Sequence, residues 1–359
     1  MGRRFIFRGE KGLLLAICLS ASAAKAQTAE KSNPDLFSVP KTYHAVFTTE
    51  NITIDGKPDE KAWEAAAWSD DFVDIEGKAK PLPALRTRLK MLWGDTCLYI
   101  LAEMEEPHIW ANLKKHDAIV YHDNDFEVFI DPSHTTHNYY EIEVNALNTI
   151  FDLFMPRPYR NGGNALIGYD VQGLRSAVQV NGTVNDPSDT DKGWTVEMAI
   201  PFNAVLPGVE PQKPKPGDAW RINFSRVEWD TDVKDGRYVK KTGEKGKPLP
   251  ERNWVWSPQG AINMHMPERW GYVYFGYEKT GVKTAPDQAA LTRLWSAYYA
   301  QQKHYRETGS YAGNAVQLGL KAADGITIEA TKQQFIIRVQ SAGNTTYQLN
   351  QEGYFSIKK

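Results

Sequence analysis

Short runs of apolar or alternating residues recur between positions 43 and 280, separated by Gly, Pro, Asn and Asp. Alternation of apolar and polar positions is typical of strands with one buried face, and these four residue types favour turns. The runs cover residues 44–54, 86–93, 97–104, 126–131, 139–146, 149–154, 176–184, 194–200, 220–229 and 270–275. So many short strands predict an all-β domain over residues 43–280, an antiparallel β-sandwich.

The pattern changes after Pro286. Residues 287–305 contain no Gly or Pro, and their large apolar side chains form one stripe at helical spacing, which predicts an amphipathic helix. The stripe consists of Leu291, Leu294, Trp295, Tyr298 and Tyr299. Three strands are expected after it, near residues 325–330, 333–340 and 345–357. We therefore expect a C-terminal extension of one helix and short strands over residues 286–359.

The first 26 residues have the layout of a secretory signal peptide. Residues 1–12 are basic, residues 13–21 are apolar, and Ala24-Lys25-Ala26 provides the small residues of a cleavage site. Cleavage before Gln27 predicts a secreted or periplasmic protein of the cell envelope, with a linker over residues 27–42. The apolar run is too short for a membrane-spanning helix, which needs about 20 residues, and no longer run follows it.

Composition narrows the class of protein. Hydrophobic residues make up 42% of the chain and charged residues 24%, which is ordinary for a globular protein and excludes a disordered or coiled-coil chain. The formal net charge of -2 includes a leader with a net charge of +4, so the rest of the chain carries -6. An acidic chain without a basic stripe argues against a nucleic-acid partner.

Two neighbouring strands place acidic side chains on one face of the predicted sheet. Within residues 126–131 the apolar side chains alternate with Glu127, and within residues 139–146 they alternate with acidic and amide side chains. Successive residues of a strand point to opposite faces, so pairing of the apolar faces brings the polar positions together. The side chains on this polar face are Glu127, Glu141, Glu143 and Asn145.

The carboxylates on this face need a partner, because like charges on neighbouring strands repel each other. An arginine, a cation or the hydroxyl groups of a polyol would offset them, and Arg226 and Arg88 are the candidate arginines. A solvated face with ordinary ion pairs is the alternative interpretation.

Six motifs follow one another between residues 45 and 277. They are IDGKPDEKAW (54–63), LKMLWGDTCLY (89–99), DNDFEVFIDP (123–132), YEIEVN (140–145), GWTVEMAIP (193–201), and WSP (256–258) with WG (270–271). In this order they resemble the family 9 carbohydrate-binding modules, which are β-sandwich sugar binders of secreted glycan-degrading proteins. The resemblance implies a protein that captures the ends of a polysaccharide or oligosaccharide.

The resemblance also implies a site in which a sugar lies between two aromatic side chains while polar side chains of the sheet bind its hydroxyl groups. Tyr121 stands at the first aromatic position, and Glu127, Glu143 and Asn145 stand at sugar-contacting positions. Arg226, the candidate counter-charge for these carboxylates, is a further expected sugar-binding side chain.

The second aromatic position holds Met264, which packs against a sugar face less well than Trp does. We therefore expect a loop to supply the missing aromatic face. The candidates are Trp110, Trp229, Trp254 and Tyr159.

A calcium loop is a further candidate site. Asp186, Asp189 and Asp191 precede Gly193 and offer closely spaced oxygen ligands. Family 9 modules often carry structural calcium, so the resemblance implies this cation. The spacing of the three aspartates is not that of an EF-hand, and a turn rich in Asp is the alternative interpretation.

Two functional classes follow from these residues. The first is a non-catalytic sugar-binding protein supported by calcium. The second is a glycoside hydrolase or lyase in which Glu127 works with Glu141 or Glu143. Retaining glycosidases need carboxyl groups about 5–5.5 Å apart and inverting ones about 6.5–9.5 Å, and both separations are reachable on adjacent strands.

Overall fold

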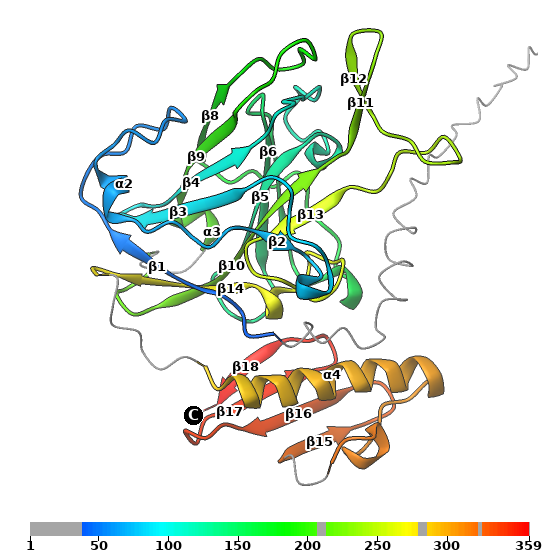
Figure 1. Ribbon diagram of the computed structural model, residues 1–359. Coiled ribbons are helices and arrows are strands. Elements are labelled where there is room, and N and C mark those ends of the chain that lie inside the picture. The colour runs from blue at the N-terminus through cyan, green and yellow to red at the C-terminus, as the bar shows by residue number, and fades with distance from the viewer. Residues whose placement is uncertain (1–37, 207–212, 279–285, 322–324, 359) are drawn as a thin grey trace, which may run out of the picture.

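The computed structural model describes residues 38–206, 213–278, 286–321 and 325–358. The predicted signal peptide of residues 1–26, its cleavage site and most of the linker of residues 27–42 lie outside the described residues. A large β-sheet domain comes first along the chain, and a unit with one long helix follows it (Figure 1).

Twelve strands of the first domain form one continuous sheet. Ten of them follow the order β7-β6-β5-β10-β14-β1-β3-β4-β9-β8, while β13 pairs with β10 and with β2. The strands are β1 (Thr42–Phe47), β2 (Val73–Asp74), β3 (Thr87–Trp93), β4 (Cys97–Glu105), β5 (Asp125–Asp131), β6 (Tyr139–Asn145), β7 (Ile150–Met155), β8 (Arg175–Asn181), β9 (Gly193–Pro201), β10 (Ala219–Glu228), β13 (Arg252–Val255) and β14 (Gly271–Gly276).

The sheet curls so that its two halves enclose one hydrophobic core (Figure 1). Phe126, Val128 and Ile130 of β5 pack in this core together with Ile100 of β4 and Met198 of β9. The three core residues of β5 are two positions apart, which is the period of a strand with one buried face. The all-β prediction is therefore confirmed.

Strand β1 joins the two halves and makes the sheet mixed. It pairs in parallel with β14 along one edge and with β3 along the other, with Thr42 opposite Tyr272. The other adjacent strands of this sheet pair antiparallel. The sandwich thus consists of one curled sheet, because β1 pairs with a neighbouring strand along each of its edges and so joins the two halves.

The short helix α2 (Ala62–Ala65) covers one end of the sheet with Trp63, which is buried. Its indole Nε1 donates a hydrogen bond to Glu197 Oε1 at 2.9 Å. A second short helix, α3 (Phe202–Val205), follows β9. The polar stretch of residues 231–252 contains a hairpin of β11 (Thr231–Lys234) and β12 (Arg237–Lys240) that projects from the domain (Figure 1).

The C-terminal unit packs helix α4 (Gln288–Thr308) on a four-stranded antiparallel sheet. Asp287 caps the helix by accepting a hydrogen bond from the backbone N–H of Ala290, and Gly309 ends it with a φ of 72°. The strands are β15 (Ile326–Ala330), β16 (Phe335–Gln340), β17 (Thr346–Asn350) and β18 (Phe355–Lys358). The helix is confirmed, but the last predicted strand is two strands, because Gly353 adopts a turn with a φ of 72°.

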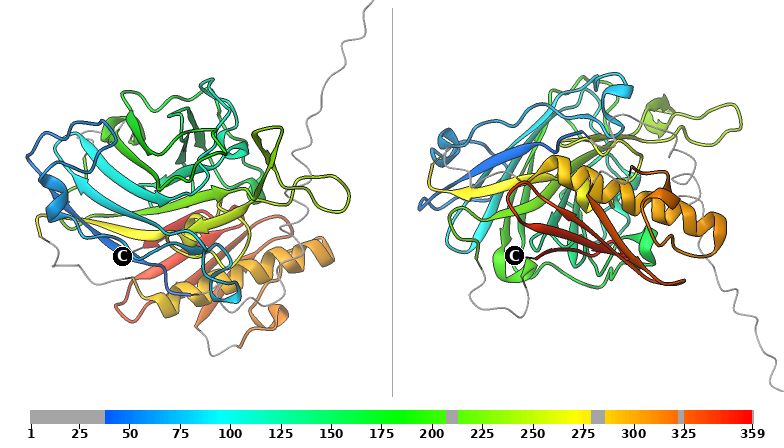
Figure 2. Two further views of the ribbon diagram at one scale, coloured as in Figure 1. Left: turned by 45° about the horizontal axis from the view of Figure 1, so that its top comes forward. Right: turned by 90° about the horizontal axis from the view of Figure 1, so that it is seen from below.

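The C-terminal unit contacts two single-turn 3-10 helices of the first domain, η4 (Tyr159–Asn161) and η5 (Pro267–Arg269). Tyr298 donates a hydrogen bond to Asn161 Oδ1 at 2.7 Å, and the Tyr299 hydroxyl donates one to Glu268. Figure 1 shows α4 and its sheet below the first domain, and in the right view of Figure 2, which is seen from below, they lie in front of it.

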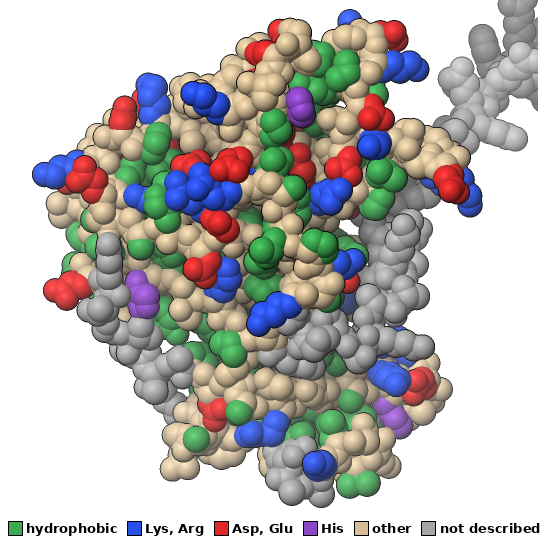
Figure 3. All heavy atoms as spheres, in the orientation of Figure 1, with side chains coloured by type: hydrophobic (Ala, Val, Ile, Leu, Met, Phe, Trp, Pro, Cys, Tyr) green, Lys and Arg blue, Asp and Glu red, His purple; other side chains and the backbone are tan. Residues whose placement is uncertain are grey.

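Within the part of the chain that is described, no helix combines the length and apolar character needed to cross a membrane. On the face shown in Figure 3, Lys and Arg are interspersed with Asp and Glu.

Candidate functional site

The structure brings the predicted acidic residues onto one face of β5 and β6. Glu127 lies directly opposite Glu143, and Glu141 lies opposite Phe129. Because the intervening residues point into the core, these carboxylates occupy the other side of the sheet. We call this surface the acidic face: it consists of Asp125, Glu127, Glu141 and Glu143.

The carboxylates of the acidic face are close together and shielded from water. Oxygens of Asp125, Glu127 and Glu143 lie within 4.8 Å of one another. None of these four residues is more than 5% exposed. Asp125 was not predicted, although it has the same strand parity as Glu127 and could have been found from that.

Burial controls the protonation of this face. It raises the pKa of Glu127 to about 7. Burial, reinforced by the neighbouring carboxylates, also raises the pKa of Asp125, Glu141 and Glu143 well above the ordinary carboxyl range. Among the described residues, no Lys or Arg forms an ion pair with Asp125, Glu127 or Glu143. The face therefore retains protons at neutral pH unless a cation binds there.

Arg226 does not reach the acidic face, so this part of the prediction is wrong. It lies opposite Phe126 in the pairing of β10 with β5, and its side chain therefore points to the core side of the sheet. There it forms ion pairs of 2.8 Å with Glu106 and Glu228 and is 1% exposed. The parity of β10 contains this signal, because Ile222 and Phe224 precede Arg226 at core positions.

Asn145 lies next to the acidic face, but its amide is fully used within the protein. The amide nitrogen donates to Leu113 O and Asp123 Oδ2, and the amide oxygen accepts from the backbone N–H of Leu147 and Thr149. A side-chain amide has two donors and one acceptor oxygen with two lone pairs, so nothing remains for a ligand. Asn145 therefore has a structural role, contrary to the prediction.

Tyr121 lies at the rim of the acidic face on the 3-10 helix η3 (Val120–His122). Its backbone N–H donates to Glu143 Oε2 at 2.9 Å, and its carbonyl accepts a hydrogen bond of 2.8 Å from the indole of Trp229. The side chain itself is 37% exposed. The residue that carries this partly exposed ring is thus held against the acidic face through its backbone.

Met264 lies beneath the surface. It is 9% exposed and packs in an apolar cluster with Phe129 and Trp270, whose indole donates to the Met264 carbonyl at 2.8 Å. Met264 therefore supports this side of the sheet from within and does not present a second stacking face.

Of the four candidate aromatics, Tyr159 lies next to His265, which adjoins the acidic face. It is 42% exposed, and its ring meets the ring of His265 edge to face, with 4.5 Å between centroids. His265 Nε2 in turn lies 3.8 Å from Glu141 Oε2. Burial, with the charges of Glu141 and Glu143, raises the pKa of Tyr159 to about 12.

The other three aromatics are less accessible. Trp110 and Trp254 are buried, and Trp254 lies on the core side beside Arg226. The ammonium group of Lys240 lies 3.2 Å from the ring centroid of Trp229.

The three aspartates of the predicted calcium loop do not converge on one point. Asp191 accepts hydrogen bonds from the backbone N–H groups of Ile109 and Thr183, and Asp186 accepts from Ser188, while Asp189 is exposed. This is the Asp-rich turn that was the alternative interpretation. Among the described residues, these three aspartates do not form a group with ligand atoms close enough to hold one ion.

Among the described residues, two other groups have ligand atoms close enough to hold a cation. One is Asp125, Glu127 and Glu143 of the acidic face. The other is His116, Asp117, Asp152 and Asp170, which the sequence analysis missed because its members are far apart along the chain.

The chain is similar to segments of two curated xylanases. It is 29% identical over 119 residues to endo-1,4-beta-xylanase A of Thermoanaerobacterium saccharolyticum, which covers 33% of this chain and 8% of that protein. It is 30% identical over 162 residues to endo-1,4-beta-xylanase C of Paenibacillus barcinonensis, which covers 45% of this chain and 12% of that protein. The chain thus matches only about a tenth of each relative.

The chain is also similar, at low identity, to solved structures. One is a family 9 carbohydrate-binding module of Caldicellulosiruptor kristjanssonii in complex with cellotriose, with 16% identity, a TM-score of 0.42, and coverage of 68% of this chain and all of that one. Another is a putative carbohydrate-binding protein of Bacteroides uniformis, with 15% identity, a TM-score of 0.49, and coverage of 66% of this chain and all of that one.

The family comparison supports the resemblance that the six motifs indicate. Residues 54–247, more than half of the chain, match the family described as carbohydrate family 9 binding domain-like. The matched segment contains β5, β6 and the acidic face. The chain therefore belongs to the carbohydrate family 9 binding domain-like family.

Proposed function

We propose that this protein binds a carbohydrate without cleaving it, at the acidic face between Tyr121 and Tyr159. The observation that carries the proposal is that two partly exposed tyrosines flank a group of buried carboxyls. The backbone N–H of Tyr121 donates to Glu143, and the Tyr159 ring reaches Glu141 through His265. The C–H groups of a sugar ring pack on an aromatic face, and its hydroxyls need fixed polar partners.

The protonation of the acidic face suits a neutral polyol. A protonated carboxyl offers one donor and further acceptors, whereas an ionised carboxylate only accepts. Burial raises the pKa of Glu127 to about 7, so both forms are present near neutral pH. A sugar hydroxyl, which both donates and accepts, is complementary to such a group.

Affinity measurements on tyrosine variants test the proposal. Tyr121→Ala and Tyr159→Ala should each weaken binding of gluco- or xylo-oligosaccharides about tenfold, which corresponds to about 1.4 kcal/mol, while the circular dichroism spectrum stays unchanged. The oligosaccharide is chosen first from a glycan array, and the affinity is measured by titration calorimetry.

The control is Tyr277→Ala. Tyr277 is also exposed but packs against Phe47 and Trp93 instead. Wild-type sugar affinity in both Tyr121→Ala and Tyr159→Ala would contradict the proposed site. An equal loss of affinity in Tyr277→Ala would contradict it as well.

A glycoside hydrolase remains the second candidate, because carboxylate oxygens of Glu127 and Glu143 lie within 4.8 Å of each other. That is close to the separation of about 5–5.5 Å in retaining enzymes. However, these side chains are only 5% and 2% exposed, which leaves little access for a glycosidic bond. Incubation of the bound oligosaccharides with the protein, followed by product analysis, decides: released sugar supports the enzyme, and intact sugar supports the binder.

Calcium is the cation that we propose for the acidic face when it is occupied. The group Asp125, Glu127 and Glu143 offers oxygen ligands only, which suits a hard cation. Addition of Ca²⁺ to chelator-treated protein should raise the melting temperature, and the rise should be smaller in Glu143→Gln. An unchanged melting temperature in the wild type would eliminate calcium.

Export to the periplasm or the medium follows from the signal peptide predicted over residues 1–26. We propose that the mature chain begins at Gln27. Amino-terminal sequencing of the protein recovered from outside the cytoplasm checks this, and a chain that retains residues 1–26 would contradict it.

A further inference from the structure

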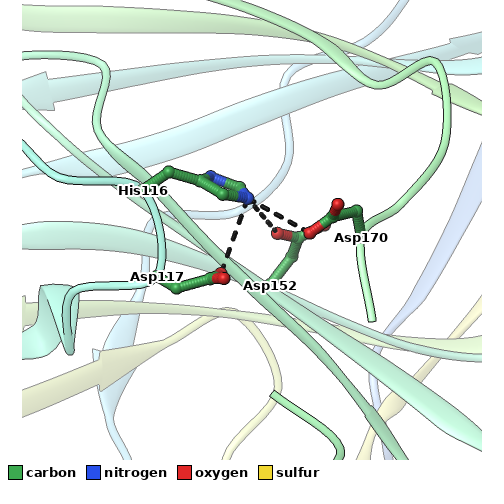
Figure 4. A group of neighbouring side chains, drawn as sticks. All are labelled: His116, Asp117, Asp152 and Asp170. Carbon is green, nitrogen blue, oxygen red and sulfur yellow. Dashed lines mark hydrogen bonds and ion pairs between the residues drawn. The ribbon is translucent and has the colours of Figure 1, made fainter. Parts of the chain in front are cut away.

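Four metal-ligating side chains meet away from the acidic face, near the edge strand β7. His116 and Asp117 lie on the loop before η3, Asp152 lies in β7, and Asp170 lies on the loop before β8. Figure 4 shows the three carboxylates arranged around Nε2 of His116. The distances from that nitrogen are 3.2 Å to Asp170, 3.5 Å to Asp117 and 3.7 Å to Asp152.

Asp152 indicates that this group is built to hold a ligand. Its side chain is 2% exposed, and Oδ2 accepts a hydrogen bond of 2.5 Å from the backbone N–H of Val171. Its other oxygen, Oδ1, is buried without a hydrogen-bond partner and points toward His116 Nε2. A buried carboxylate oxygen without a hydrogen bond is costly, and the imidazole nitrogen at 3.7 Å is too far away to supply one. A bound cation would supply the missing interaction.

The backbone holds the other ligands in place. The N–H of Asp117 donates to the carbonyl of Ile150 at the start of β7, which ties the loop of His116 and Asp117 to this strand. Asp117 Oδ1 is likewise buried without a hydrogen bond. The ligand atoms of all four residues lie within 4.8 Å of one another, so little movement is needed to close them around an ion.

We propose that His116, Asp117, Asp152 and Asp170 form a site for a divalent transition-metal ion, with Zn²⁺ as the preferred ion. In a tetrahedral zinc site with bonds of about 2.0–2.1 Å, neighbouring ligand atoms are roughly 3.3 Å apart, near the observed separations from His116 Nε2. An imidazole nitrogen suits zinc and related ions, whereas Ca²⁺ takes six to eight oxygen ligands at longer distances.

Four protein ligands would make this a structural site. The metal would join the loop of His116 to β7 and to the loop of Asp170. The side chains of His116 and Asp170 are each 53% exposed, so the ion can enter from solvent.

The test uses the full chain after treatment with a chelator and dialysis. Titration calorimetry with ZnCl₂ should show one ion per chain, and the melting temperature should rise by several degrees at about 100 times the dissociation constant. Equimolar CaCl₂ should not displace the ion. Co²⁺ in place of zinc should give the visible absorption of a tetrahedral site.

Variants assign the binding to these residues. Asp152→Asn and His116→Ala should lower zinc affinity at least a hundredfold and abolish the cobalt spectrum. Asp170→Ala, at an exposed position, should lower zinc affinity at least tenfold and keeps the test decisive if Asp152→Asn does not fold. His304→Ala, on α4, and Glu143→Gln, on the acidic face, are controls that should bind zinc like the wild type.

Three results would overturn the proposal. They are the absence of stoichiometric zinc binding by the wild type, zinc binding that survives both His116→Ala and Asp170→Ala, and displacement of zinc by equimolar calcium. Each leaves the carbohydrate site untouched, because that site is tested on Tyr121 and Tyr159.

Discussion

At the scale of single residues, environment decides what each charged side chain can do. Glu127 and Arg226 lie on adjacent strands, but they point to opposite faces of the sheet. Glu127 is surrounded by other carboxyls and has a raised pKa, whereas Arg226 is neutralised by Glu106 and Glu228. The acidic face is therefore a candidate binding surface, and the arginine belongs to the framework.

The raised pKa of Glu127 predicts that stability falls as pH rises. Its pKa increases from 4.5 to about 7 on folding, so the folded state binds more protons than the unfolded state between these values. The stability is fully present below about pH 4.5 and is lost through about pH 7, by on the order of 3 kcal/mol for a shift of this size.

Urea unfolding between pH 4.5 and 8 measures this effect, and Glu127→Gln should flatten the dependence. An identical pH profile in the variant and the wild type would show that Glu127 is not the group responsible.

Replacement of Arg226 is expected to lower the stability of the protein without a direct effect on ligand binding. Arg226→Met should destabilise the protein by about 3–5 kcal/mol, because the buried carboxyl groups of Glu106 and Glu228 would lose their ion-pair partner. Urea unfolding measures the loss. Triple replacement with Glu106→Gln and Glu228→Gln should restore much of it; if sugar affinity falls while stability does not, the structural role is wrong.

At the scale of elements, the position of η4 determines where Tyr159 lies. This single turn contacts the C-terminal unit directly through Asn161 and Tyr298. Its Arg160 also forms an ion pair of 2.8 Å with Glu268 of η5, which in turn accepts a hydrogen bond from Tyr299 of α4. An aromatic ring on a loop stacks well only if the loop is held. The C-terminal unit thus supports one wall of the proposed sugar site.

This arrangement predicts an effect of Tyr298→Phe at a distance. Loss of the hydroxyl should remove about 1 kcal/mol of stability and weaken sugar binding two- to fivefold, since η4 becomes less fixed. Calorimetric titration measures the affinity. Tyr305→Phe, on the same helix, is the matched control. Equal sugar affinities of the wild type, Tyr298→Phe and Tyr305→Phe would show that the C-terminal unit does not support the position of η4.

At the scale of the whole molecule, the two parts share a buried polar contact. Glu268 is 6% exposed and accepts from both Arg160 and Tyr299. Because it connects η4, η5 and α4, the first domain and the C-terminal unit should unfold together.

Differential scanning calorimetry of the wild type should therefore show one transition. Glu268→Ala leaves Arg160 without its partner and should split this into two transitions or lower the single one. Two transitions already in the wild type would contradict the coupling.

The sequence by itself determined the strand faces, the helix of the C-terminal unit and the family. Side-chain direction has a period of two in a strand and 3.6 in a helix, so local order is enough to place Glu127, Glu141 and Glu143 on one face and to predict α4. The same parity could have placed Arg226 in the core and Asp125 on the acidic face.

Only the tertiary structure decided which distant segments meet. The parallel pairing of β1 with β14, the approach of Tyr159 to His265 and the convergence of His116 with Asp152 and Asp170 join residues far apart in the chain. Hydrogen bonds with such distant segments also engage the amide of Asn145 and the carboxylate of Asp191. Local patterning determines side-chain direction, but it contains no information on partners brought together by chain closure.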